Sequence, residues 1–343
     1  MHPLDEALEL SLHGNQDESF SILSKFCKQY PYDERAAFNL GWHEMKQGNL
    51  LTGHKYLTRG RLANVFGNKH IGSSKPFWNG ERGVTVLMEM EGGLGDQIHA
   101  IRYAKDIANY GNKVIISGSE HLAEIMIDCE GVSAFCQHEV ATGIYHDYWI
   151  PSMSVTIPLG YEFKDISGEP YIRKIGSSDR KVGVKWSGNP VFEHQQHRLF
   201  PSQLMFDTVN DEDCISLQKK DGETDGNVDS PSWMEQPSLD TWKDTQRAIS
   251  LCDLVITSCT GVAHLSAAMG IETWVVVPIL SYYLWALPGN KTPYYNSVTL
   301  FRQEKYGCWE APFKKIKQTL TTRRISKREK LPMGESTLSF VEA

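Results

Sequence analysis

A regular alternation of apolar strand patterns and helical patterns is the feature that most limits how this chain can fold. From residue 84 onward, short apolar runs are separated by segments in which apolar residues recur at helical spacing. The expected strands are 84–90, 113–117, 148–150, 182–186, 214–218, 253–257 and 272–277, and the expected helices are 96–110, 121–128, 241–252 and 261–269. Strands joined through helices form parallel sheets, with right-handed connections and helices on both faces.

The pattern is interrupted near residues 160–180, where glycine, proline and serine gather. We therefore predict an α/β fold with two Rossmann-like domains, at 80–175 and 176–320, and a cleft between the carboxyl ends of their strands. The polar, turn-rich segment 221–239 predicts a surface loop that is a candidate lid over this cleft. Residues 321–343 carry a basic run and predict a solvated, mobile tail.

The first 75 residues follow a different pattern, which predicts a small all-helical segment ahead of the two domains. Gly14-Asn15 recurs as Gly48-Asn49, and Leu23 recurs as Leu57, at an offset of 34 residues. This offset is the period of tetratricopeptide repeats, so residues 1–75 resemble about one and a half such repeats. The alternative is a generic helical hairpin. The segment would serve either as a surface that docks an acceptor or as a structural cap.

Composition and charge exclude several classes of protein. The formal net charge is −7, from 35 lysines and arginines against 42 aspartates and glutamates, which argues against nucleic acid as a partner. No apolar run approaches the ~18–20 residues of a membrane span, and the acidic start has no signal-peptide pattern. We therefore expect a cytoplasmic protein without a transmembrane segment. The seven cysteines contain no CxxC pair, which predicts reduced thiols and no structural metal.

A glycine-rich turn follows the first expected strand, at residues 91–99. Its glycines let the backbone approach a ligand, and the next helix directs free N–H groups into the cleft. A dinucleotide-binding fingerprint is the obvious rival, but Ile98 stands where its third glycine belongs. Asp96 is either a helix-capping carboxylate or a general base that takes a proton from an acceptor hydroxyl. His99, one turn later, is either a helper of that base or a structural histidine.

Two cations stand near the end of the expected strand 182–186, namely Lys185 and, in the loop beyond it, Arg198. A lysine as a point charge and an arginine as a fork suit a diphosphate, and the alternative is a pair of solvated surface charges. The histidines His194 and His197 alone are a weak indication of a metal. An Asp-x-Asp at 211–213 matches a metal–nucleotide signature, but it precedes a buried strand and predicts a turn.

The strand at 253–257 ends in Thr260-Gly261-Val262, where the next helix begins. Backbone N–H groups and a hydroxyl at a helix N-terminus form a site for an anion. The alternative is an ordinary threonine cap without a ligand. His264 lies in the first turn of this helix, where it either contacts the ligand or packs against the strand.

These motifs follow one order along the chain. The order runs through residues 93–99, 184–190, 216–219 and 260–264, then Trp285, 293–295 and 300–303. The ordered set resembles the tetratricopeptide-containing glycosyltransferases related to glycosyltransferase family 9, the ADP-heptose lipopolysaccharide heptosyltransferases, over roughly residues 84–320. A more distant parallel is the protein O-linked N-acetylglucosamine transferase. Residues 92–95 are also similar to fucosyltransferases, whose downstream basic motif is missing from this chain.

The resemblance implies a GT-B fold, in which domain 80–175 holds the acceptor and domain 176–320 holds a nucleotide-sugar donor. It implies inverting, metal-independent transfer to a glycan, lipid-linked or protein acceptor, with no cofactor besides the nucleotide-diphosphate sugar. Asp96 matches the catalytic base of the family, and His99 stands beside it. The donor-binding residues that the resemblance implies are Gly93, Gly95, Lys185, Ser187, Arg198, Lys219, Thr260, Gly261, Val262 and His264.

Two departures from the family pattern bear on activity. Cys259 stands where the family usually has an aspartate before the threonine, and the first α/β domain, about 90 residues long, is short for a domain. They motivate an alternative hypothesis, in which the chain is a catalytically inactive binding or scaffold protein that keeps the GT-B and tetratricopeptide-like fold.

Overall fold

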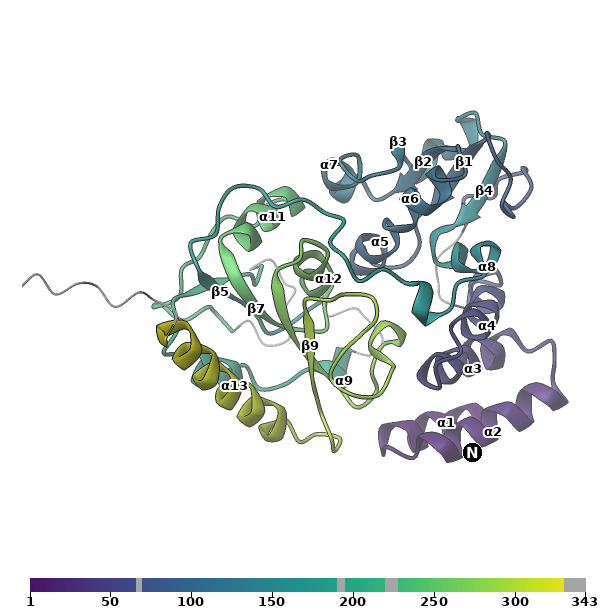
Figure 1. The fold of residues 1–343 in the computed structure, drawn as a ribbon. Helices are drawn as coiled ribbons and strands as arrows, with labels where there is room; N and C mark the ends of the chain where they lie inside the picture. The colour runs from purple at the N-terminus through teal and green to yellow at the C-terminus, as the bar shows by residue number, and fades with distance from the viewer. Residues whose placement is uncertain (66–69, 190–194, 220–227, 330–343) are drawn as a thin grey trace, which may run out of the picture.

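A computed structural model describes residues 1–65, 70–189, 195–219 and 228–329 of the chain. It contains two parallel β-sheets, formed within residues 85–151 and 181–302, and an N-terminal group of helices (Figure 1). The predicted α/β class with parallel sheets is therefore confirmed. The helical group packs against both α/β parts, since α4 contacts the loop after β4 and α3 contacts the loop after β8.

The first sheet has the strand order β3-β2-β1-β4, and its strand pairs are parallel. Its strands are β1 (Thr85–Glu89), β2 (Lys113–Gly118), β3 (Val132–Gln137) and β4 (Tyr148–Pro151). Val86, Leu87 and Met88 of the inner strand β1 are fully buried, as expected for a strand covered on both faces. The edge strand β3 was not predicted, because its residues are only half-buried and its apolar pattern is weak.

The helices of this part are short. They are α5 (Leu94–Ala100), α6 (Tyr103–Ala108), α7 (Ala123–Met126) and α8 (Thr156–Leu159), with 3-10 turns at Glu120–Leu122, His138–Gly143, Ser152–Ser154 and Phe163–Asp165. The single helix predicted at 96–110 is thus two helices. The helical hydrogen-bond pattern changes at Ile101, whose carbonyl accepts from the Ala104 N–H, three residues on, at 3.0 Å. This tighter turn separates α5 from α6.

The second sheet has the strand order β6-β5-β7-β8-β9, also with parallel pairs. Its strands are β5 (Lys181–Lys185), β6 (Cys214–Ser216), β7 (Cys252–Ser258), β8 (Glu272–Val277) and β9 (Val298–Arg302). Its helices are α9 (Gln195–Arg198), α10 (Ser202–Val209), α11 (Trp242–Ser250), α12 (Gly261–Ala268) and α13 (Glu310–Glu329), with a 3-10 turn at Tyr283–Trp285. In this order the chain reverses direction across the sheet between β5 and β7, where open α/β sheets bind their ligands.

Two predictions about the second part meet the structure in different ways. The acidic triplet 211–213 is a turn before β6, as predicted, and Arg324 and Lys181 form ion pairs with its carboxylates. The prediction that a solvated tail begins at residue 321 is wrong for the first residues of that segment, because α13 continues to Glu329 and packs on α10 and β9. Arg323 on this helix pairs with Asp253 and Glu272, so these turns belong to the folded part.

Several predicted features fall partly outside the described residues. They are residues 330–343 of the basic tail, residues 221–227 of the candidate lid, and Pro190 and His194 in the loop after Lys185. The described half of the candidate lid pairs with the edge of the sheet, since Glu235 exchanges backbone hydrogen bonds with Cys214 and Ser216. None of the helices in the described ranges combines the length and apolar character needed to cross a membrane.

The N-terminal helices form two hairpins with equivalent turns. The helices are α1 (Pro3–Leu12), α2 (Gln16–Gln29), α3 (Glu34–Lys46) and α4 (Leu50–Leu62). Gly14 and Gly48 close the two hairpins with φ near +86° and +90°, a conformation that favours glycine. The predicted all-helical segment is consistent with this arrangement, and its assignment as tetratricopeptide repeats stays a prediction.

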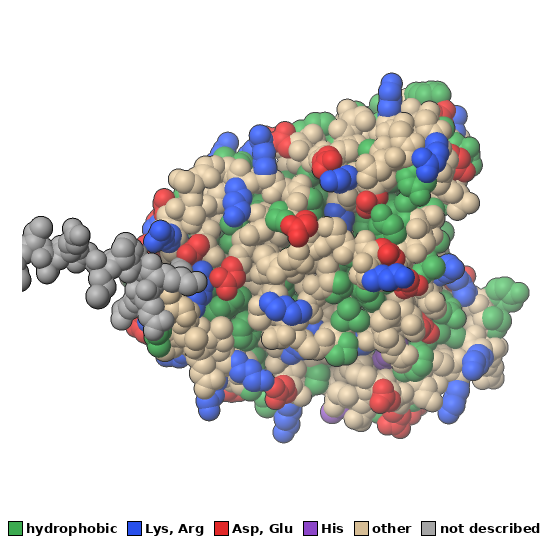
Figure 2. Space-filling model, viewed as in Figure 1, with side chains coloured by type: hydrophobic (Ala, Val, Ile, Leu, Met, Phe, Trp, Pro, Cys, Tyr) green, Lys and Arg blue, Asp and Glu red, His purple; other side chains and the backbone are tan. Residues whose placement is uncertain are grey.

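Charged side chains of both signs are interspersed on the surface. Figure 2 shows lysine and arginine side chains next to aspartate and glutamate on the viewed face, outside the grey atoms, with no gathered basic surface there. This mixed pattern agrees with the small net negative charge of −7.

Candidate functional site

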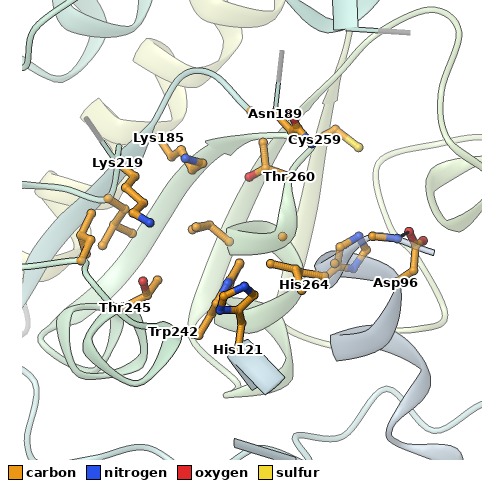
Figure 3. A pocket seen from close by; sticks show the side chains of 18 of the residues that line it. Asp96, His121, Lys185, Asn189, Lys219, Trp242, Thr245, Cys259, Thr260 and His264 are labelled. Atoms are coloured by element: carbon orange, nitrogen blue, oxygen red, sulfur yellow. Dashed lines mark hydrogen bonds between the residues drawn. The ribbon is translucent and has the colours of Figure 1, made fainter. Parts of the chain in front are cut away.

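A cleft of about 610 Å³ lies between the two α/β parts, at the carboxyl ends of β1, β5, β6, β7 and β8. Ten of the twelve predicted site residues line it, namely Gly93, Gly95, Asp96, Lys185, Arg198, Lys219, Thr260, Gly261, Val262 and His264. Figure 3 shows Lys185 and Lys219 at one end of the cleft and Asp96 at the other, with Thr260 and Trp242 between them. The fold therefore brings together residues that are far apart in the sequence.

Asp96 is held in place by hydrogen bonds to both of its carboxylate oxygens. It is the third residue of α5, and its Oδ2 accepts from the N–H of the N-cap residue Gly93 at 2.9 Å, which caps the helix start. Its Oδ1 accepts from the Tyr282 hydroxyl at 2.8 Å, across the domain boundary. Gly92 makes this geometry possible, because a Cβ there would lie 2.7 Å from Asp96 Oδ2 and its φ is +72°.

The environment of Asp96 suits a group that exchanges protons near neutrality. Burial raises the pKa of Asp96 to about 6, although the Tyr282 hydroxyl and the Gly93 N–H act in the opposite direction by stabilising the charged form. A carboxylate offers about four lone-pair positions, so two hydrogen bonds leave room for a further donor. The two readings of Asp96, cap and base, are therefore compatible in one residue.

Positive charge lines the opposite end of the cleft. Lys185 is the last residue of β5, is 5% exposed and pairs in register with Thr257 on β7, at the point where the strand order reverses. Arg198, on α9, donates to the carbonyl of Cys259 at 2.8 Å and to that of Asn189 at 3.3 Å. Because Cys259 directly follows β7 and Asn189 lies in the loop after β5, Arg198 ties together the two loops at the switch point.

The start of α12 faces the cleft. Thr260 is its N-cap residue, and the Thr260 side chain makes no capping hydrogen bond with the described residues. The first N–H groups of a helix have no acceptors within the helix and carry partial positive charge, so they favour an anion. Gly261 also permits close packing, since a Cβ at this position would lie 2.7 Å from the Trp242 ring.

Gly95 is required by the contact between the two α/β parts. A Cβ at Gly95 would lie 3.1 Å from the His264 ring and 3.2 Å from the Gly261 Cα, because α5 crosses the start of α12 here. This packing accounts for the glycine at position 95. It also fixes the distance between the carboxylate on α5 and the helix start on α12.

Cys259 and His264 belong to a buried aromatic group beside the cleft. Cys259 accepts a hydrogen bond from the Trp285 indole at 2.9 Å, and burial raises the pKa of its thiol to about 11. His264 stacks on Trp285 and its Nδ1 lies 3.0 Å from the Tyr295 hydroxyl. Burial lowers the pKa of His264 to about 3, so the ring is neutral at physiological pH.

Two predicted site residues do not line the cleft. His99 faces the packing between the two α/β parts, where its Nδ1 lies 3.2 Å from the Tyr295 hydroxyl, and burial lowers its pKa well below the usual range. Ser187 is buried behind the cleft wall, and its N–H donates to the Gln218 side chain at 3.0 Å. The structure thus corrects the placement of both residues, because α5 and the loop after β5 turn these side chains toward the core.

Four aromatic residues of the cleft were not predicted from the sequence. They are Tyr282 after β8, Trp242 at the start of α11, His121 in the first α/β part and Trp42 on α3. Tyr282 follows the carboxyl end of a parallel strand, a position that could have drawn attention to it. His121 likewise follows the carboxyl end of the parallel strand β2, whereas Trp242 and Trp42 reach the cleft through the packing of separate segments, which leaves no local sequence signal.

No group of three histidine, cysteine, aspartate or glutamate side chains within residues 1–65, 70–189, 195–219 and 228–329 could hold a metal ion. The expectation of metal-independent chemistry therefore stays a prediction.

Comparison with known proteins finds likeness in structure. No protein-family model matches the sequence, and no curated protein matches it. The chain is similar to the glycosyl transferase family 9 protein from Veillonella parvula DSM 2008, with a TM-score of 0.52, 10% identity, and coverage of 72% of this chain and 98% of that one. At this identity the likeness shows a shared fold, which agrees with the architecture that the resemblance to family 9 implied.

Two further solved structures are more distant. One is the iron-containing dodecameric glycosyltransferase TibC from enterotoxigenic E. coli H10407, with a TM-score of 0.46, 12% identity and coverage of 67% of this chain. The match spans 66% of the TibC chain. The other is E. coli ADP-heptose lps heptosyltransferase II, with a TM-score of 0.48, 10% identity, and coverage of 71% of this chain and 99% of that one.

Proposed function

We propose that this protein is a glycosyltransferase that moves a sugar from a nucleotide-diphosphate donor to an acceptor hydroxyl. One observation carries the proposal: a cleft between two parallel sheets has the carboxylate of Asp96 at one end, Lys185 and Lys219 at the other, and the start of α12 between them. Such a cleft offers a base to one substrate and an anion site to the other. The shared fold with a family 9 glycosyltransferase supports this assignment.

The donor would bind with its diphosphate between Lys185 and the start of α12. Lys185 supplies a full charge, and the N–H groups of Gly261 and Val262 supply fixed dipoles at the same switch point. These groups act most strongly on the charge that develops on the leaving diphosphate, so they would lower the barrier for its departure. Arg198 would act mainly by holding the loops at Cys259 and Asn189 in position.

The chemistry is a single displacement at the anomeric carbon. The acceptor oxygen forms a bond to this carbon while the bond from the carbon to the diphosphate oxygen breaks, and the electron pair leaves with the nucleoside diphosphate. The acceptor proton passes to Asp96. With a pKa of about 6, most Asp96 is ionised at neutral pH and can accept that proton, and attack from the face opposite the leaving group inverts the configuration.

The donor site is tested by nucleotide binding. Thermal-shift and calorimetric titrations with UDP, GDP, ADP and CMP, without added metal, should show that one base family stabilises the protein. Lys185→Met should weaken that binding by about tenfold or more, because it removes a charge at the diphosphate. Lys181→Met is the matched control, because Lys181 is the first residue of β5 and lies at the amino end of the strand, away from the cleft. This variant should leave nucleotide binding unchanged.

A panel in which no nucleotide binds, or in which both lysine variants bind equally well, would contradict the donor site. The first result would favour the alternative of a binding or scaffold protein that retains the fold. Cys259, in place of the expected aspartate, is the feature that motivates this alternative.

A further inference from the structure

The N-terminal helices contribute an aromatic side chain to the cleft. Trp42 on α3 lines the cleft although it belongs to neither sheet. Its ring forms T-shaped pairs with the rings of Tyr282 and Tyr283, with centroid separations of 5.2 and 6.2 Å. Aromatic residues of the helical group and of the loop after β8 thus form one wall at the Asp96 end of the cleft.

The position of Trp42 is set by buried contacts that attach the helical group to the first α/β part. Arg61 on α4 and Glu91 after β1 form an ion pair at 3.3 Å, with 3% and 4% of their side chains exposed. Thr58 on α4 and Ser154 share a hydrogen bond of 2.9 Å that is also buried. These buried polar contacts attach the helical group to the first α/β part and so position Trp42 beside the cleft.

The chemistry of this end of the cleft differs from that of the donor end. Tyr282 joins the wall to the catalytic carboxylate through its 2.8 Å hydrogen bond to Asp96, and Pro278 and Leu280 add apolar surface. The lysines and arginines that line the cleft in the described chain all lie between residues 185 and 243. Figure 3 shows Lys185 and Lys219 at the other end of the cleft from Asp96, and the Asp96 end offers aromatic surface and a carboxylate.

We infer that this end of the cleft binds an uncharged sugar ring of the acceptor, with the apolar C–H face of the sugar against Trp42 and a hydroxyl directed to Asp96. The inference rests on the proposed function and names the class of acceptor. An amphipathic aromatic ring beside a hydrogen-bond acceptor matches the two kinds of surface that a sugar presents. A phosphate or carboxylate at the same place would face the Asp96 charge, at the opposite end of the cleft from Lys185 and Lys219, and would be disfavoured.

The acceptor site is tested by ligand binding to the full chain. Methyl β-D-glucopyranoside and methyl β-D-galactopyranoside serve as uncharged probes, and glucose 6-phosphate serves as the charged probe, each measured by saturation-transfer NMR titration. We expect at least one methyl glycoside to bind more tightly than glucose 6-phosphate. Trp42→Leu should weaken that binding by about tenfold, which corresponds to about 1.4 kcal/mol.

A matched control separates stacking from packing. Phe38 lies one turn before Trp42 on α3 and packs on it with a centroid separation of 6.3 Å, but it does not line the cleft. Phe38→Leu should therefore leave glycoside binding unchanged. If Trp42→Leu does not fold, Trp42→Phe keeps an aromatic ring in place and should weaken glycoside binding by a smaller factor, about threefold.

The outcomes separate this inference from the proposed function. Nucleotide binding in the same samples reports on the donor site, and it should be the same in wild type, Trp42→Leu and Phe38→Leu. If a nucleotide binds but no methyl glycoside does, the acceptor inference is wrong and the donor proposal stands. Equal effects of the Trp42 and Phe38 variants, unchanged binding in Trp42→Phe, or tighter binding of glucose 6-phosphate would also overturn it.

Discussion

Replacing Arg61 with methionine tests whether the helical group is a fixed part of the folded unit. The Arg61 guanidinium pairs with Glu91 at 3.3 Å and donates to the Met153 carbonyl and to Thr58, each at 3.1 Å. Glu91 in turn accepts from the Met153 N–H at 2.9 Å. Methionine fills a similar volume, so Arg61→Met removes the charge and the hydrogen bonds while leaving Glu91 buried.

The expected loss is large because both side chains are almost fully buried. Removing one partner of a buried ion pair costs about 3–5 kcal/mol, since the remaining charge has no partner and little water. Arg59→Met is the matched control on the same helix, because the Arg59–Glu34 pair is 39% and 35% exposed. That variant should lose only about 0–1 kcal/mol.

The loss should also depend on pH in a defined direction. Burial raises the pKa of Glu91 and the Arg61 charge lowers it, so Arg61→Met raises the pKa of Glu91 in the folded state further. The buried carboxylate destabilises the protein only when it is ionised. The difference between variant and wild type is therefore greatest above that raised pKa and shrinks as the pH falls and Glu91 is protonated.

The assay is urea unfolding followed by far-UV circular dichroism and tryptophan fluorescence, at about pH 7 and about pH 5. The double variant Arg61→Met with Glu91→Met should recover most of the loss, because it replaces the pair with apolar side chains. The reasoning is refuted if Arg61→Met and Arg59→Met lose equal free energy, or if the Arg61→Met deficit grows at the lower pH.

Two other substitutions test the site itself. Tyr282→Phe should move the acid limb of the pH–rate profile to higher pH by about one unit, because the hydrogen bond that it removes stabilises the ionised form of Asp96 and so keeps its pKa at about 6. An unchanged acid limb would show that ionisation of Asp96 does not set it. Gly95→Ala should lower the free energy of unfolding by about 1–3 kcal/mol in urea titrations, because the added methyl group would lie 3.1 Å from the His264 ring and 3.2 Å from the Gly261 Cα. An unaltered urea midpoint would mean that α5 and α12 are not tightly packed.

Much of the fold could be predicted because hydrophobic periodicity reports it directly. The buried inner strands, such as β1 and β7, are continuous apolar runs, and the turns after them carry the glycines and the threonine that begin α5 and α12. The edge strand β3 was missed because its residues are only half-buried and its apolar pattern is weak. The edge strand β9 was missed although three of its five residues are buried.

The candidate site could be predicted only where one segment supplies the signal. Asp96 and His99 stand three residues apart on α5, and only the packing of α5 on α12 decides that the carboxylate faces the cleft and the imidazole faces the core. Trp42 and Tyr282 meet through the docking of the helical group on the loop after β8. Such contacts depend on tertiary structure, which no local spacing encodes.

The most direct test of the central claim compares Asp96→Asn with Asp244→Asn in a donor-turnover assay, with released nucleoside diphosphate as the readout. Asp244, the third residue of α11, likewise accepts from the N–H of its N-cap residue Thr241 but does not line the cleft, so it matches the capping role of Asp96. We expect Asp96→Asn to reduce turnover by about 10²–10⁴-fold with unchanged nucleotide binding, and Asp244→Asn to retain turnover. Full turnover in Asp96→Asn would contradict its role as the general base.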